Sequence, residues 1–215
     1  MKVVLFGATG MIGQGVLREC LLDERIDSVQ TVGRSKTGAA HAKLTETERA
    51  DLFSYADGEF GDADACFFCL GVSSAGMGEA AYSRVTYDLT MAAAKAFRPG
   101  AKFIYVSGVG TNEQGRQMWA RVKGRTEREL LESPLDAYML RPGYIQPMHG
   151  ERSRTGLYNA LYVIAKPLYP LLRRVAPGQV TTTEAMGRAM IRIAFRGYPQ
   201  KVLEPKEINN AAADT

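Results

Sequence analysis

The chain has 215 residues, of which 46% are hydrophobic and 23% charged, and its formal net charge is +4. This length is enough to bury one sizeable core, and no Pro/Gly/Ser-rich linker divides it, so we expect a single domain over residues 1–215. The basic residues are scattered and no nucleic-acid-binding signature occurs, which argues against a nucleic-acid partner.

Cysteine usage points to a reducing compartment. The chain has 3 cysteines, an odd number that argues against a disulfide framework, and we expect a cytoplasmic location. Cys66 and Cys69 have the spacing of a redox pair, but they fall in an apolar run that predicts a buried strand. Positions three apart on a strand face opposite sides and lie about 10 Å apart, so the redox interpretation is set aside. No secretory signal precedes the glycines of "MKVVLFGATG".

Short β-rich runs alternate with helical patterns along the chain. This alternation predicts a Rossmann-like α/β fold, a doubly wound parallel sheet with helices on both faces in three layers. Strands are expected at 2–6, 28–33, 43–48, 65–70, 102–107, 136–141 and 201–204. Helices are expected at 11–22, 51–57, 79–98, 115–132, 156–175 and 183–196. We expect a core over 1–145, a helical C-terminal extension over 146–215 on the substrate side, and disorder at 209–215.

A glycine-rich loop follows the first expected strand. "VVLFGATGMIGQGV" places Gly7, Gly10 and Gly13 between a strand and a helix. Glycines there permit a tight turn and let a pyrophosphate approach backbone N–H groups at a helix N-terminus. The alternative is a turn whose glycines only pack helix against strand. The expected cofactor contacts in this loop are Gly7, Thr9, Gly10, Met11, Ile12 and Gly13.

Basic residues follow the second expected strand, in "VGRSKTG". Dinucleotide-binding folds usually carry an acid there, which holds the adenosine ribose diol. An acid would repel a 2′-phosphate, whereas the forked guanidinium of Arg34 can bind one. We therefore expect NADP(H) in preference to NAD(H), with Arg34 and Ser35 as contacts. The alternative is a solvated loop arginine.

Further motifs extend this pattern. The GxxGxxG spacing, followed in order by "FFCLG", "RVTYDLT", "VSGVG", "ARVKGRTERELL" and "LRPG", resembles the short-chain dehydrogenase/reductase superfamily. The similarity is to its atypical branch, which includes Tat-interacting-protein-oxidoreductase-like and bacterial epimerase-like proteins. It covers residues 1–150 firmly and the rest loosely. The further cofactor contacts that it implies are Asp51, Leu52, Leu70, Gly71, Val72, Lys123, Pro142, Gly143 and Tyr144. Alternatives are a helix-capping Asp51 and a rigid turn at 142–144 without ligand contact.

The resemblance also implies a catalytic set, and this chain departs from it. In the superfamily a serine orients the carbonyl, a tyrosine transfers its proton, and a lysine four residues later lowers the tyrosine pKa and holds the nicotinamide ribose. Ser107 and Lys123 match, but Trp119 occupies the tyrosine position. An indole N–H only donates and does not titrate near neutral pH, so it cannot act as a general acid or base.

Three interpretations of this substitution stay open. In the first, the chain is an oxidoreductase whose proton comes from Tyr144, Tyr82 or a water held by Ser107. In the second, it is a non-catalytic NADPH-binding regulator or scaffold. In the third, Trp119 is plain core packing and Lys123 a solvated lysine.

The most apolar stretch is "GLYNALYVIAKPLYPLLRRVAPG", residues 156–178. A lysine and two prolines interrupt it, so its uninterrupted apolar runs are shorter than the roughly 20 residues that span a bilayer, and no transmembrane segment is expected. We expect it to cover the substrate cleft or to form a dimer contact, which favours an apolar carbonyl or alcohol substrate. Peripheral membrane contact stays open, as does the choice between monomer and homodimer. His41 and His149 lack ligand neighbours at metal spacing, so no metal is expected.

Overall fold

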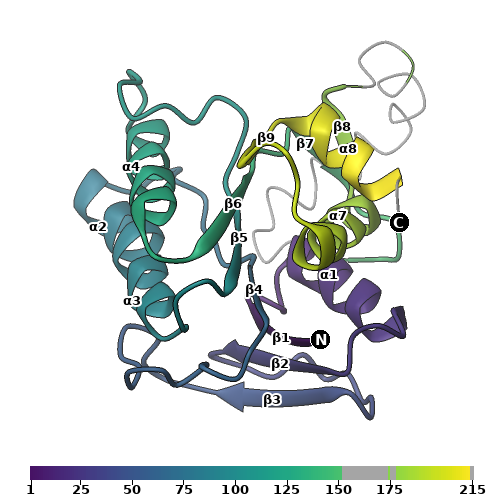
Figure 1. Cartoon of the computed structure of the whole chain (residues 1–215). Helices are drawn as coiled ribbons and strands as arrows, with labels where there is room; N and C mark the ends of the chain where they lie inside the picture. The colour runs from purple at the N-terminus through teal and green to yellow at the C-terminus, as the bar shows by residue number, and fades with distance from the viewer. Residues whose placement is uncertain (152–173, 175–177, 214–215) are drawn as a thin grey trace.

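The computed structural model describes residues 1–151, 174 and 178–213. Within these ranges the main sheet is parallel, with the strand order β3-β2-β1-β4-β5-β6-β9 (Figure 1). Its strands are β1 (Lys2–Phe6), β2 (Ser28–Gly33), β3 (Leu44–Glu48), β4 (Ala65–Phe68), β5 (Lys102–Val106), β6 (Asp136–Leu140) and β9 (Val202–Leu203). A separate parallel pair joins β7 (Tyr144–Gln146) to β8 (Val180–Thr182). The predicted Rossmann-like doubly wound fold is confirmed.

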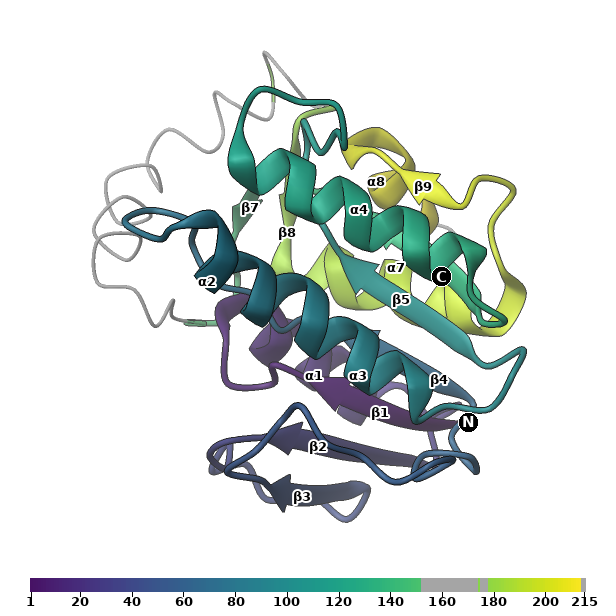
Figure 2. The same cartoon turned by 90° about the vertical axis from the view of Figure 1, so that its left-hand side faces the viewer.

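Helices cover both faces of the sheet (Figure 1, Figure 2). One layer contains α1 (Met11–Leu22), α7 (Thr183–Arg196) and α8 (Pro205–Ala213). The other contains α2 (Glu79–Ser83), the π-helical turn η1 (Arg84–Asp88), α3 (Leu89–Lys95) and α4 (Met118–Glu132). Strand β1 shows why two layers form: Val3 and Leu5 join the core under α1 and α7, whereas Val4 and Phe6 join the opposite core. Both faces of the strand are apolar, as in interior parallel strands.

Small residues allow α7 to pack closely on α1. A Cβ on Gly15 of α1 would lie 2.6 Å from Cβ of Thr183, and one on Gly187 of α7 would lie 2.7 Å from Cγ of Glu19. Side chains larger than hydrogen would push the helices apart. Residues 178–213 are part of the fold itself, because α7 and α8 complete one layer and β9 extends the sheet.

Most of the predicted elements occur, with boundaries shifted by a few residues. Helix 183–196 is confirmed at its predicted ends, and the helix expected at 79–98 is interrupted by η1. The expected helix 156–175 lies outside the described residues. The disorder expected from residue 209 is wrong as far as Ala213, because α8 extends to that residue.

The helix predicted at 51–57 is also wrong, since that segment forms bends and turns. Asp51 Oδ1 accepts a hydrogen bond from the Phe53 N–H at 2.8 Å, and Glu59 Oε2 accepts one from the Ala56 N–H at 3.0 Å. Such local bonds give the backbone an alternative to the helical ladder.

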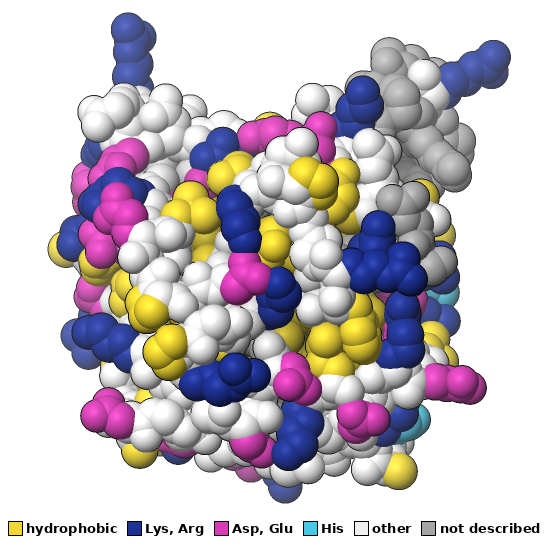
Figure 3. Space-filling view, in the orientation of Figure 1, with side chains coloured by type: hydrophobic (Ala, Val, Ile, Leu, Met, Phe, Trp, Pro, Cys, Tyr) yellow, Lys and Arg dark blue, Asp and Glu magenta, His cyan; other side chains and the backbone are white. Residues whose placement is uncertain are grey.

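The surface carries both signs of charge. Figure 3 views the molecule from the side shown in Figure 1, and basic and acidic side chains are interspersed over this face. In the part of the chain that the structure describes, no helix is both long and apolar enough to cross a bilayer.

Candidate active site

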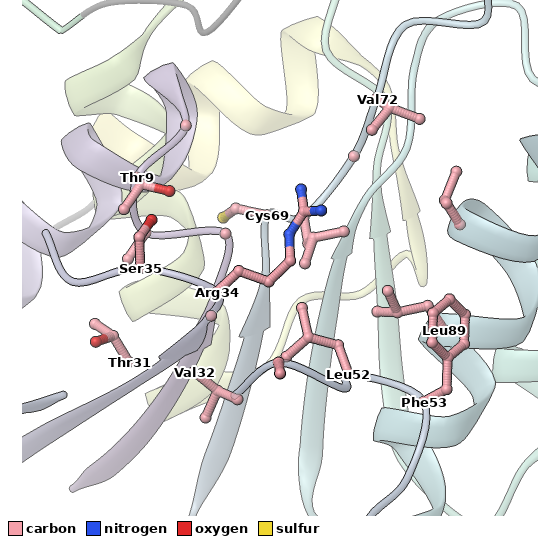
Figure 4. Close-up of a pocket in the computed structure, with 18 residues that line it drawn as sticks. Thr9, Thr31, Val32, Arg34, Ser35, Leu52, Phe53, Cys69, Val72 and Leu89 are labelled. Carbon is pink, nitrogen blue, oxygen red and sulfur yellow. The ribbon is translucent and has the colours of Figure 1, made fainter. Parts of the chain in front are cut away.

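A pocket opens where the strand order reverses. The chain moves from β1 outward to β2 and β3, returns to β4 beside β1, and then continues in the other direction. In open α/β sheets ligands bind at the carboxyl ends of the strands at this point. The pocket has a volume of about 410 Å³, and its walls come from the segments after β1, β2, β3 and β4 and from the start of the η1–α3 stretch (Figure 4).

The glycines of the first loop have two different roles. Gly7 has a φ of +79°, and a Cβ there would lie 2.6 Å from the backbone nitrogen of Leu70. A Cβ on Gly13 would lie 2.1 Å from the carbonyl oxygen of Gly7. Both positions require glycine for packing alone, as the alternative interpretation of this motif proposed. Gly10 is less constrained, since its Cβ would lie 3.3 Å from the Gly7 carbonyl oxygen.

Gly10 is the N-cap of α1, and no side chain caps this helix or places an acid in its first turn. The first N–H groups of a helix lack intrahelical acceptors and carry the positive end of its dipole. Gly7, Thr9 and Gly10 line the pocket. Met11 is buried in the core and Ile12 packs against it, so these two can offer only backbone N–H groups to a ligand. The helix start is open to an anion.

Arg34 leaves the end of β2 and reaches over the pocket (Figure 4). The side chain is exposed, and no carboxylate within the described residues forms an ion pair with it. Ser35 lines the same pocket, whereas Lys36 does not. A forked cation therefore stands at the pocket without a counter-ion from residues 1–151 or 178–213.

One wall of the pocket is apolar. Leu52 is buried and lines the pocket together with Val85 of η1 and Leu89 of α3. Asp51, predicted beside the adenine, is not part of the walls. It does not cap a helix either, because the carboxylate instead accepts the Phe53 N–H within a turn. Phe53 lines the pocket, and the Arg84 guanidinium lies 5.1 Å from the centre of its ring.

The segment after β4 forms the opposite wall. Leu70, Gly71 and Val72 all line the pocket, as expected. A Cβ on Gly71 would meet no atom within 4 Å, so packing does not explain this glycine. The neighbouring thiol of Cys69 packs toward one core while Cys66 belongs to the other, and both are free cysteines. This arrangement agrees with the opposite faces expected of the pair.

Ser107 follows β5 and is buried. Its Oγ lies 3.0 Å from Oγ1 of Thr111, and that threonine hydroxyl donates to the carbonyl oxygen of Gly108 at 2.7 Å. A hydroxyl has a single hydrogen, and a carbonyl oxygen can only accept. The Thr111 hydroxyl therefore donates its hydrogen to Gly108, and Ser107 is the donor in its hydrogen bond with Thr111. In this arrangement the Ser107 hydroxyl offers lone pairs to a ligand and no hydrogen.

Lys123 and Trp119 lie one turn apart on α4. The Lys123 ammonium donates to the carbonyl oxygens of Ser107 at 3.1 Å and Val106 at 3.3 Å, and it lies 5.5 Å from the centre of the Tyr105 ring. Trp119 is partly buried and belongs to neither core cluster of the described residues. Its indole lies beside Gly110, where a Cβ would stand 3.5 Å from Cη2. The helix therefore brings the lysine to the end of β5.

A buried carboxylate sits one turn beyond Lys123. Glu127 is buried and forms an ion pair with Arg141, whose other partner is Glu204 at 3.1 Å. Burial lowers the pKa of Lys123 to about 8, and the charge of Glu127 only partly opposes this shift. Since the guanidinium already neutralises Glu127, the ammonium has no carboxylate of its own among the described residues.

The loop after β6 is hydrogen-bonded to the segment that follows β5. The Val109 N–H donates to the Pro142 carbonyl oxygen at 3.1 Å, and a Cβ on Gly143 would lie 2.4 Å from the Gln179 carbonyl oxygen. The hydroxyl of Tyr144 donates to Gln146 Oε1 at 2.9 Å. Packing accounts for Gly143, and the Tyr144 hydrogen is engaged. Tyr82, the other tyrosine considered as a proton donor, is buried in α2.

Several residues of the site had not been predicted. Thr111, Glu127 and Arg141 determine the polar environment of Ser107 and Lys123, and Val85 and Leu89 line the pocket. The four-residue spacing from Lys123 to Glu127 on one helix was visible in the sequence. The pairing with Arg141 was not, because it depends on how α4 packs against β6. Among the described residues, no three His, Cys, Asp or Glu side chains gather as a metal site.

Curated proteins with related sequences were found, although no family model matches the chain. It is 28% identical over 171 residues to the protein FMP52-1, mitochondrial, of Scheffersomyces stipitis, covering 76% of this chain and 74% of that protein. It is 25% identical to FMP52-2, mitochondrial, of the same organism, covering 97% and 96%. It is 26% identical to the protein HTATIP2 of Rattus norvegicus, covering 67% and 62%.

The names of the FMP52 proteins contradict the cytoplasmic location predicted for this chain, because they point to mitochondria. The prediction depended on cysteines that are indeed free. Free thiols are compatible with a reducing compartment but do not distinguish one such compartment from another.

Solved structures share the fold at low sequence identity. UDP-glucuronic acid 4-epimerase from Bacillus cereus in complex with NAD has a TM-score of 0.67 at 14% identity, covering 94% of this chain and 76% of that one. MoeE5 in complex with UDP-glucuronic acid and NAD has a TM-score of 0.65 at 16% identity, covering 94% and 74%. An oxidoreductase of the short-chain dehydrogenase/reductase family from Burkholderia thailandensis has a TM-score of 0.66 at 15% identity, covering 98% and 92%.

Proposed function

We propose that this chain, an atypical short-chain dehydrogenase/reductase by its fold and its relatives, binds NADP(H) as a single domain and oxidises or reduces an apolar alcohol or carbonyl compound. The observation that carries the proposal is one pocket that combines an uncapped helix N-terminus, an open glycine and an arginine that forms no ion pair with the described residues. These three features are contributed by Gly10, Gly71 and Arg34.

The donor set of the pocket fits a phosphorylated dinucleotide. The start of α1 offers backbone N–H groups and a positive dipole end to a pyrophosphate. Leu52, Val85 and Leu89 offer an apolar wall to a flat adenine ring. A 2′-phosphate suits Arg34 and Ser35, since no described carboxylate neutralises the guanidinium. The absence of an acid among the pocket walls after β2 favours NADP(H) over NAD(H).

The residues of the catalytic region have separable roles in this proposal. The bound nicotinamide would supply or accept the hydride. Lys123 and the loop at 142–144 would hold the nicotinamide end, and Tyr144 would border the site. The lone pairs of Ser107 would accept a hydrogen bond from the hydroxyl of an alcohol substrate. Trp119 would cover the reacting region with an apolar face and exclude water.

Exposed apolar side chains support the substrate class. Val109 follows β5 and is 42% exposed, and Met148 follows β7 and is 45% exposed. Val109 lies at the carboxyl edge of the main sheet, where the pocket opens, and Met148 follows a strand of the separate β7–β8 pair. Large apolar side chains exposed near a ligand site mark a surface that an apolar ligand can cover.

Calorimetric titration with NADPH and NADH tests the cofactor assignment. Arg34→Ala should weaken NADPH binding about tenfold, because one charge-assisted contact contributes roughly 1.5 kcal/mol, and should change NADH binding by less than about twofold. Lys36→Ala is the matched control, a cation in the same loop that does not line the pocket. Equal losses for both nucleotides, or no binding of either, would refute the assignment.

Trp119 favours a second candidate, a non-catalytic NADPH-binding regulator or scaffold. A side chain that cannot titrate stands where the superfamily carries its proton carrier, and the Ser107 hydrogen is committed to Thr111. This candidate predicts NADPH binding without NADPH oxidation on any carbonyl. Measuring NADPH consumption with a panel of aldehydes and ketones separates the two.

A further inference from the structure

A proton carrier is needed if this chain is catalytic, and the following inference rests on the oxidoreductase function proposed above. We propose that Lys123 is a catalytic residue in its own right, which exchanges with the substrate oxygen the proton that a tyrosine carries elsewhere in the superfamily. The proposal follows from which hydrogens around the end of β5 are already committed.

The hydroxyls at this place cannot supply the proton directly. The hydrogen of Ser107 goes to Thr111, whose own hydrogen goes to the carbonyl oxygen of Gly108. The hydroxyl of Tyr144 donates to Gln146. The indole of Trp119 keeps its hydrogen at any neutral pH. A substrate oxygen beside Ser107 therefore needs a titrating group from another side chain.

Lys123 has a hydrogen to give. An ammonium carries three hydrogens, and two carbonyl oxygens, those of Val106 and Ser107, account for two of them. These contacts fix the ammonium at the end of the strand from which Ser107 projects. No other acceptor among the described residues takes the third hydrogen, which is left for a ligand beside that serine.

The charges around Lys123 favour proton exchange near neutral pH. The titratable and charged groups around it are Tyr105 of β5, with Tyr82 of α2 beyond it, and Glu127 of α4, which is paired with Arg141. Burial also raises the pKa of Tyr105, which keeps this phenol neutral. The lowered pKa of Lys123, about 8, places its titration where a general acid or base is most effective.

The reaction with Lys123 as proton carrier balances with the nicotinamide cofactor and water alone. In reduction, the carbonyl carbon accepts the hydride that reduced cofactor supplies. One N–H bond of the Lys123 ammonium breaks as an O–H bond forms on the substrate oxygen, and the neutral amine then takes a proton from water. In oxidation of the alcohol the neutral amine accepts the hydroxyl proton, and the hydride passes to oxidised cofactor.

The first test uses the protein without cofactor. Lysine ε-carbon NMR shifts report the protonation of each ammonium, and Lys123→Arg assigns the signal. We expect the pKa of Lys123 to lie about two pH units below the ordinary lysine value near 10.4. A Lys123 midpoint at that ordinary value overturns the proposal.

The second test separates proton transfer from cofactor holding. Lys123→Arg keeps the charge but does not titrate, so kcat for reduction of 2-octanone should fall about 100-fold or more, with NADPH affinity changed less than about threefold. Wild-type reduction should slow as pH rises through about 8, because it needs the ammonium. The proposal is overturned if Lys123→Arg binds NADPH more weakly but has the wild-type kcat. It is also overturned if the wild type binds NADPH yet reacts with neither 2-octanone nor 2-octanol. Loss of NADPH binding by the wild type itself would instead remove the proposed function.

Discussion

The two halves of this site follow different rules. In the nucleotide-binding half, between β1 and β4, nearly every expected residue lies in or beside one pocket, and the requirements fall on backbone atoms. They are a φ of +79° at Gly7, a contact too close for any Cβ at Gly13, and a helix start after Gly10 that no side chain caps. In the catalytic half, between β5 and α4, Ser107 and Lys123 match the pattern expected from the sequence, but Trp119 stands at the tyrosine position and Thr111 takes the Ser107 hydrogen.

The difference shows which part of a function a fold preserves. Backbone geometry leaves few residue choices, so the binding half changes little without loss of the fold. Side-chain chemistry on the same scaffold can change residue by residue, and function must be argued from the site itself. The predictions below test this contrast, starting with the largest effect.

Gly13→Ala should destabilise the nucleotide-binding half. A Cβ there would lie 2.1 Å from the Gly7 carbonyl oxygen, and backbone cannot move aside without disturbing β1, so the free energy of unfolding should fall by about 3 kcal/mol. Urea denaturation followed by circular dichroism measures this. Gly71→Ala is the matched control, because its Cβ would meet no atom within 4 Å. It should fold normally and lose NADPH affinity, and a fully functional Gly71→Ala would remove that residue from the cofactor contacts.

Trp119→Tyr should sharpen the contrast in the catalytic half. The substitution places a titrating phenol one turn before Lys123, and general acid catalysis contributes about 100-fold or more. The rate of NADPH-dependent ketone reduction should therefore rise about 100-fold, measured at saturating NADPH. Trp119→Phe is the control for loss of the indole alone. If both variants behave alike, the tyrosine position is not where the proton passes.

Lys123→Met should reveal the cost of the buried ammonium. Its pKa is about 8 when folded, below the ordinary value near 10.4, so between these values the unfolded chain binds more protons. Wild-type stability must then rise with pH across this window. Below pH 8 the variant should be more stable than the wild type by about 1–2 kcal/mol, and the difference should vanish by about pH 10.5. Thermal unfolding at several pH values measures this stability difference. Lys95→Met, at an exposed lysine of α3, is the control, and its stability difference from the wild type should not change with pH.

Thr111→Val should have the smallest effect. It removes the acceptor of the Ser107 hydrogen while preserving shape, which frees Ser107 to donate to a carbonyl oxygen. The KM for a ketone should fall by about threefold, and stability should drop by about 1 kcal/mol for the lost bonds. Thr111→Ser retains the hydroxyl and should match the wild type. An unchanged KM in the valine variant would mean that Thr111 does not control the serine.

The sequence predicted those parts that depend on local pattern. The alternation of strands and helices identified the sheet, and the glycines marked the pocket. The helix at 51–57 failed because Asp51 and Glu59 bond locally to the backbone, a competition that apolar periodicity does not record. The Glu127–Arg141 pair, and the pocket wall from η1, depend on tertiary packing and had no sequence signal.

The most direct test of the account is fluorescence titration of the protein with NADPH, because Trp119 is the single tryptophan of the chain. We predict that NADPH quenches its emission while nicotinamide emission rises by energy transfer, with one saturation curve for both signals. Trp119→Phe should bind NADPH with similar affinity but lose the transfer. Saturable NADPH binding without any change at Trp119 would contradict a tryptophan beside the nicotinamide, and no binding at all would contradict the cofactor assignment itself.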